Sequence, residues 1–131
     1  MKIQFKTNQK IFDFELHPND KGKGEGQKRI LKGGTYPLLS NVNPRIILDI
    51  GANIGATSIF FSLNYPMAKI YSFEPSKSNF NILTTNVKNF PNIKTLNKGA
   101  FNRNVEKKIF IDNSGGGRNS IHETWTNSKN F

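Results

Sequence analysis

The feature that most constrains the fold is a five-residue apolar run, residues 46–50, that ends directly at a glycine-containing turn. The run reads IILDI, and the turn GANIG occupies residues 51–55. A short, nearly continuous apolar run bounded by turn residues is typical of a parallel strand buried on both faces. Residues 56–64 follow with apolar side chains at helical spacing, and Pro66 ends that helix. The pattern predicts a strand, a tight turn and a helix in succession.

The same alternation repeats downstream. Residues 68–73 predict a second strand, and Pro75 and Ser76 open a second helix that ends before Pro91. Residues 93–97 predict a third strand. Strands joined in this way by helices imply a parallel sheet with right-handed crossovers, so the fold class is α/β.

The segments on either side of this centre have weaker patterns. Residues 2–17 alternate apolar and polar side chains around a turn, which predicts a β-hairpin. Residues 18–29 have no large apolar side chain and are expected to form a mobile loop, and residues 30–39 a short helix or turn. A fourth strand is predicted over 107–112, followed by a glycine-rich loop over 113–120.

Composition excludes several classes of function. The 131 residues include no cysteine and two histidines, so disulfides, thiol catalysis and a His-rich metal centre are excluded, and no metal is expected. No apolar run approaches the ~18–20 residues that span a bilayer. The N-terminus lacks a signal-peptide core, so we expect a cytoplasmic protein. The net charge of +10 comes from 15 scattered lysines and only four arginines, which favours solvated lysines over a nucleic-acid partner.

The turn after the first strand carries the chemical signal. In a parallel sheet, ligands bind outside the carboxyl ends of the strands. Gly51 and Gly55 form G-x-x-x-G, whereas a dinucleotide site needs G-x-G-x-x-G. Asn53 stands at the second glycine position, which argues against NAD or FAD. Glu74 lies 19 residues beyond Gly55, at the end of the next strand, where a carboxylate can accept hydrogen bonds from both hydroxyls of a ribose.

These residues resemble a known family. The stretches ILDIGANIGATSIFFS (47–62) and AKIYSFEPSKSNFNILTTNV (68–87) are similar to the FkbM-type branch of the class I S-adenosylmethionine-dependent methyltransferases. The shared signature is an Asp-x-Gly-Ala-Asn-x-Gly turn, then Phe-Glu-Pro with Asn79 four residues later. Residues 92–121 are similar as well, so the resemblance covers about residues 33–121. It implies a Rossmann-like parallel sheet with flanking helices, preceded here by a short hairpin.

The resemblance also implies a cofactor site for S-adenosyl-L-methionine. Its methionine end is expected over the glycine turn, with Asp49 holding the turn and contacting the amino group, and Glu74 taking the ribose hydroxyls. The adenine is expected beside Pro75 and Ser76. After the third strand this sequence has Gly-Ala-Phe-Asn (99–102), where the family tends to have Ala-Leu-Ser-Asp. This difference falls at the expected contact with the edge of the adenine. The expected cofactor-binding residues are Asp49, Gly51, Ala52, Asn53, Gly55, Glu74, Pro75, Ser76, Gly99 and Ala100.

The implied reaction is methylation of a hydroxyl on a sugar or another small molecule. Methyl transfer from a sulfonium depends on near-attack positioning, and a base can remove the hydroxyl proton. No motif identifies that base; His122, beside Glu123 after the glycine-rich loop, is the candidate. Arg118 could bind an anionic group and Tyr36 could cover the cofactor, although a solvated side chain is the commoner role for each.

The family's domain has a seven-stranded sheet and continues with a Lys-Ile-Asp-x-Glu-Gly stretch that does not occur here. We therefore expect a hairpin and flexible loop over 1–32 and a truncated methyltransferase domain over 33–131. The C-terminal half of the sheet would be missing, leaving an apolar edge and a bare face. We expect such a chain not to transfer methyl groups alone.

Three other classes stay open at this point. One is an NAD-type oxidoreductase, which the glycine spacing disfavours. Another is a basic nucleic-acid-binding module or RNA methyltransferase fragment, although the Asn/Asp-Pro-Pro-Tyr/Phe element of base methyltransferases is absent. The third is a non-catalytic interaction domain. The methyl acceptor and the oligomeric state are not predicted.

Overall fold

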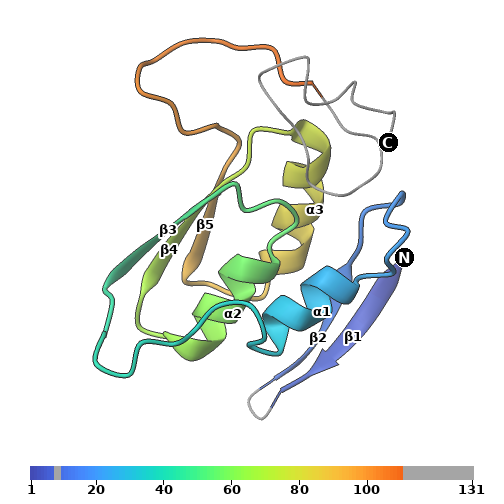
Figure 1. Cartoon of the computed structure of the whole chain (residues 1–131), viewed down its shortest axis with the longest axis vertical. Helices are drawn as coiled ribbons and strands as arrows, with labels where there is room; N and C mark the ends of the chain where they lie inside the picture. Colours follow the sequence, from blue (N-terminus) through green and yellow to red (C-terminus); the bar gives the residue numbers. More distant parts are fainter. Residues whose placement is uncertain (8–9, 111–131) are drawn as a thin grey trace.

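The computed structural model describes residues 1–7 and 10–110. Within these residues a two-stranded antiparallel hairpin precedes a three-stranded parallel sheet with its connecting helices (Figure 1). In chain order the elements are β1 (Lys2–Lys6), β2 (Ile11–Glu15), α1 (Glu25–Leu31), β3 (Ile46–Ile50), α2 (Ala56–Asn64), β4 (Lys69–Phe73), α3 (Lys77–Val87) and β5 (Ile93–Leu96).

The central alternation of strands and helices is confirmed. The parallel sheet has the order β3-β4-β5, so each strand pairs with the next one along the chain. The register aligns Asp49 of β3 with Ser72 of β4, and Phe73 of β4 with Leu96 of β5. The carboxyl ends of the three strands therefore meet at one edge of the sheet, which is the edge where the glycine turn begins.

The three helices lie on one side of this sheet (Figure 1). The inward-facing side chains of α2, α3 and β4, among them Ile59, Ile70 and Leu83, are fully buried. The expectation that β3 is buried on both faces is wrong, because Ile46, Leu48 and Ile50 are each at least 60% exposed. The physical reason is that no element among the described residues covers the second face, so alternate side chains of β3 point to solvent. The bare face expected of an incomplete sheet is present.

The N-terminal hairpin is also confirmed, and it is packed rather than detached. Phe12 and Phe14 are buried, and the Phe12 ring meets the Phe90 ring edge-on at 5.3 Å between centroids. The hairpin phenylalanines belong to the same buried cluster as Ile59 of α2. The proposed boundary between residues 1–32 and 33–131 stays a prediction.

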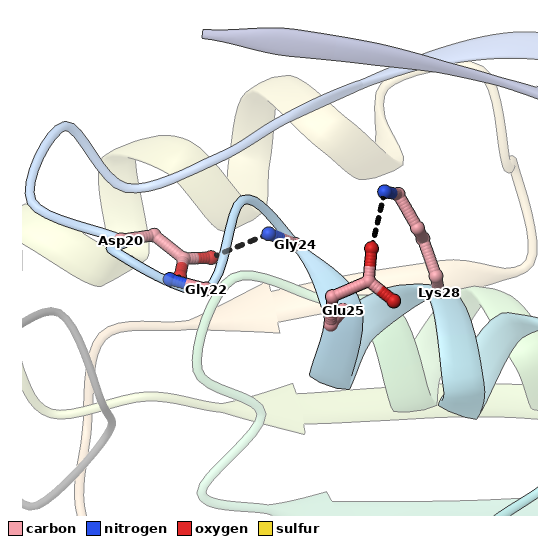
Figure 2. Close-up of polar contacts among 5 residues, drawn as sticks. All are labelled: Asp20, Gly22, Gly24, Glu25 and Lys28. Atoms are coloured by element: carbon pink, nitrogen blue, oxygen red, sulfur yellow. Dashed lines mark hydrogen bonds and ion pairs between the residues drawn. The ribbon is translucent and has the colours of Figure 1, made fainter.

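Residues 18–29 differ from the predicted mobile loop, because α1 begins at Glu25. The preceding turn is closed by Asp20, whose carboxylate accepts hydrogen bonds from the backbone N–H of Gly22 (2.9 Å) and of Gly24 (3.1 Å) (Figure 2). An ion pair of 2.7 Å then joins Glu25 to Lys28 within the helix. The helix is supported by the Asp20 turn at its start and by two apolar side chains at its end, Ile30 and Leu31, which pack against the core.

The predicted strand over 107–112 is not present as a strand in its described part. Residues 107–109 are irregular, and Phe110 forms an isolated bridge. Residues 111–112 and the predicted glycine-rich loop over 113–120 lie outside the described residues. A strand needs a neighbour to satisfy its backbone groups, and among the described residues no further strand pairs with β3 or β5, the two edges of the parallel sheet.

Candidate functional site

The glycine turn leaves β3 in a left-handed backbone conformation. Gly51 has φ 81°, Asn53 has φ 51° and Gly55 has φ 98°. The N–H groups of Gly51 and Ala52 both donate to the carbonyl of Phe73, each at 2.9 Å. The turn is thereby fastened to the end of the neighbouring strand β4. Positive φ is easily adopted by glycine and tolerated by asparagine, which explains the residue types at these positions.

Glu74 holds the same turn from the end of β4. Its Oε2 accepts the backbone N–H of Asn53 at 2.8 Å, and its Oε1 accepts the backbone N–H of Ser76 at 2.8 Å. Only 4% of Glu74 is exposed. Burial raises the pKa of this carboxyl above its ordinary value, the two backbone hydrogen bonds oppose that rise, and the charge of Asp49 adds to it. Glu74 is thus positioned by the backbone rather than by a cation.

Asp49 does not contact the turn through any hydrogen bond found in the described residues. Its Oδ2 accepts the hydroxyl of Ser58, in the first turns of α2, at 2.6 Å. The Ser58 and Ser72 hydroxyls are 2.7 Å apart and both are fully buried. Burial raises the pKa of the Asp49 carboxyl, and the Ser58 hydrogen bond partly offsets this. The role of holding the turn, expected of Asp49, is carried instead by Glu74.

Sequence reasoning missed Ser58 and Ser72. Ser72 is a small polar residue between aromatic residues of a strand, which was a signal, whereas Ser58 stands beside Thr57 and has no such contrast with its neighbours. The sequence could not say which partner satisfied each hydroxyl. Their hydrogen bonds tie α2 to β3 and β4 directly behind the carboxyl ends of the strands.

A pocket of about 1050 Å³ opens over this edge of the sheet. Four of the ten predicted cofactor residues line it, namely Gly51, Pro75, Gly99 and Ala100. A Cβ added to Gly51 would meet no atom within 4 Å, so the backbone there is open to a ligand. Asn97 also lines the pocket, and its Nδ2 donates to the carbonyls of Glu74 (2.8 Å) and Pro75 (3.1 Å), which joins the segment after β5 to the segment after β4.

The other predicted residues lie behind that surface. Ala52 and Ser76 are buried, with 4% and 1% exposed. Gly55 faces α3, because a Cβ there would lie 2.9 Å from Leu83 Cδ1 and 3.2 Å from Val87 Cγ1. The role of Gly55 is therefore close packing of the turn against α3, which leaves Gly51 as the glycine open to the pocket.

The remaining candidates are not brought to this pocket. Tyr36 lies against the rings of Phe60 and Phe61, at 6.4 and 5.7 Å, and lines a different pocket of about 460 Å³. His122, with Arg118 and Glu123, lies outside the described residues. Within the part of the chain that the structure describes, no group of three or more His, Cys, Asp or Glu side chains could hold a metal ion. No helix in that part is both long and apolar enough to cross a membrane.

Comparison with known proteins gives partial matches. No sequence-family profile matches the chain. A stretch of 60 residues, 46% of this chain and 23% of the relative, is 35% identical to the methyltransferase SdnD of Sordaria araneosa. Two solved structures are similar to the fold, and the chain spans less than half of each. One is M. jannaschii TYW2 in complex with AdoMet, with a TM-score of 0.47 and 22% identity over 85% of this chain and 48% of that chain. The other is P. horikoshii TYW2 in complex with MeSAdo, with a TM-score of 0.45 and 16% identity over 75% and 36%.

Proposed function

We propose that this chain is the cofactor-binding part of a methyltransferase and that S-adenosyl-L-methionine is its cofactor. The observation that carries the proposal is the joining of the glycine turn to Glu74 beneath an open pocket. The similarity of 60 residues to a curated methyltransferase supports the same class of reaction. The FkbM-type branch is the finer assignment that the motifs favour.

Glu74 has the remaining capacity that a ribose would need. Each carboxylate oxygen has about two acceptor positions, and one on each oxygen is used by the backbone of Asn53 and Ser76. One acceptor position on each oxygen is not used by these two hydrogen bonds, although Glu74 is 4% exposed and lies behind the residues that line the pocket, so a ribose would have to enter between Gly51 and Pro75 to reach it. Gly51 presents a backbone without a side chain, so a ligand can approach the turn closely. The residues present therefore fit the proposed cofactor.

The cofactor, when bound, supplies an electrophilic methyl group on a sulfonium. The chain's own contribution is to hold that group beside the acceptor. The pocket of about 1050 Å³ is at the upper end of the ~300–1,000 Å³ of ordinary ligand sites, so it has room for a cofactor and a small acceptor together. The proposed acceptor is a hydroxyl on a sugar or another small molecule, and His122 is the proposed base.

A calorimetric titration tests the cofactor proposal. We expect the chain to bind S-adenosylhomocysteine and not NADH. Replacing Glu74 with glutamine removes the charge that accepts the ribose hydroxyls, and hydrogen bonds to a charged group contribute about 1.5–3 kcal/mol, so affinity should fall about 10- to 100-fold. Glu25→Gln is the matched control, because Glu25 lies on α1 outside the pocket. Binding of NADH alone, or unchanged affinity in Glu74→Gln, would contradict the proposal.

A further inference from the structure

Asn86 connects the N-terminal hairpin to the glycine turn. It lies in α3 with 5% of its surface exposed. Its Oδ1 accepts the backbone N–H of Glu15 at 2.7 Å, and its Nδ2 donates to the carbonyls of Glu15 (2.9 Å) and Ile54 (2.8 Å). One buried amide therefore bonds to the last residue of β2 and to a residue inside the turn.

The turn is held at two points by side chains from different elements. Glu74 fixes the N–H of Asn53 from the end of β4, and Asn86 fixes the carbonyl of Ile54 from α3. Of the left-handed residues, Asn53 lies between these two contacts and Gly55 directly follows them. A turn in this conformation keeps its shape only while its surroundings hold it, so each contact bears on the shape that a cofactor would meet.

The hairpin in turn fixes the orientation of the Asn86 amide. The paired hydrogen bonds to the N–H and carbonyl of Glu15 leave one Nδ2 hydrogen pointing to Ile54. A side chain with all its polar atoms engaged in the interior has one allowed orientation, because any rotation leaves buried groups unpaired. Glu15 itself is held in β2 by pairing with Lys2 of β1.

We infer that Asn86 is a positioning residue through which the β1–β2 hairpin sets the conformation of the glycine turn. Hairpin order and cofactor affinity are then coupled, and the coupling acts in both directions. The inference about affinity rests on the proposed function, whereas the inference about the turn does not.

Asn92 is a matched control within the same chain. Its Oδ1 accepts the hydroxyl of Ser62 at 2.6 Å, and its Nδ2 donates to the carbonyl of Ala68 at 3.0 Å. It joins elements as Asn86 does, but at the amino end of the strands, opposite the glycine turn. Asn86→Asp and Asn92→Asp each keep the acceptor and remove the donors, so a purely structural role predicts the same pattern for both variants.

Amide hydrogen exchange in the absence of ligand tests the turn directly. The N–H groups of Asn53 and Gly55 are both hydrogen-bonded and should exchange slowly. We expect Asn86→Asp to speed their exchange at least about tenfold more than Asn92→Asp does, when both are compared with the amide of Lys32, which bonds within α1 and to neither asparagine. Equal acceleration in the two variants overturns the inference, whether or not the chain binds S-adenosylhomocysteine.

Ligand binding tests the coupling first in the unsubstituted chain and then in the Asn86→Asp variant. Added S-adenosylhomocysteine should slow the exchange of the Glu15 amide more than that of the Ala68 amide, and Asn86→Asp should weaken S-adenosylhomocysteine binding about tenfold. Protection of the turn without protection of Glu15 overturns the coupling. If the chain binds no S-adenosylhomocysteine, the proposed function and the coupling to affinity are both refuted. The role of Asn86 in holding the turn is then decided by the hydrogen exchange measured without ligand.

Discussion

Gly51 and Gly55 share a sequence motif but face different surroundings. Both have positive φ, so both are costly positions for any other residue. Gly55 packs its Cα against Leu83 and Val87 of α3, whereas Gly51 faces the open pocket. The G-x-x-x-G motif was interpreted as a single contact with the cofactor. It instead combines Gly55, which packs against α3, with Gly51, which is open to the proposed ligand.

Alanine at each glycine separates these two roles. Gly55→Ala places a methyl group 2.9 Å from Leu83 at φ 98°, so a backbone cost of about 1–2 kcal/mol adds to an overpacking cost of about 1–3 kcal/mol. Gly51→Ala has the backbone cost alone, but its methyl group enters the pocket. We expect chemical denaturation to show the larger loss of unfolding free energy for Gly55→Ala, and calorimetry to show weaker S-adenosylhomocysteine binding for Gly51→Ala. Equal destabilisation, or full affinity in Gly51→Ala, would refute this division.

At the scale of elements, β3 has one covered and one bare face. Leu48 and Ile50 lie beside Tyr71 and Phe73 in the parallel register, so apolar side chains of two strands share the bare face. An apolar surface of this kind marks a place where a further element or partner would pack. The described elements cover the opposite face alone (Figure 1).

Two leucines test this one-sided arrangement. Leu48 on β3 is 60% exposed, and Leu83 on α3 is fully buried. Leu83→Ala should lower the unfolding free energy by about 2–5 kcal/mol because it leaves a cavity. Leu48→Ala should cost less than about 1 kcal/mol, mostly strand propensity. Urea denaturation of each variant measures these two changes in the free energy of unfolding. A cost at Leu48 similar to that at Leu83 would mean that the second face is covered in solution.

The sequence predicted the elements whose signals are local. The apolar run and the helical spacing placed β3 and α2 within the observed bounds. The exposure of β3 could not be predicted, because it depends on whether a distant element covers that face. The helix α1 was missed because Asp20 and the Glu25–Lys28 pair support it in place of apolar periodicity.

In the site, too, local signals were predictable and contacts between distant elements were not. Glu74 and the glycine turn were predicted to lie together because topology places the carboxyl ends of parallel strands at one edge. The contacts of Asn86 and Ser58 depend on helix rotation and register, which the sequence does not state. The contact of Glu74, and not of Asp49, with the turn has the same origin, since either carboxylate could have reached it.

At the scale of the whole molecule, a hairpin, a parallel sheet and its helices converge on one turn. The N-terminal hairpin bonds to α3 through Asn86, α3 bonds to the turn, and β4 holds the turn through Glu74. Gly51 of that turn lines the pocket, whereas Ile54 and Asn86, which carry the contact to the hairpin, do not. We propose that the cofactor binds at this turn.

Amide chemical shifts during titration with S-adenosylhomocysteine test that claim most directly. The full chain is labelled with ¹⁵N, and each backbone amide reports on its own surroundings. We expect saturable shifts that are largest at Gly51, Ala52, Gly99 and Ala100, which lie in or beside the pocket. Saturable shifts centred on the separate pocket beside Tyr36, or no saturable shift at all, would contradict it.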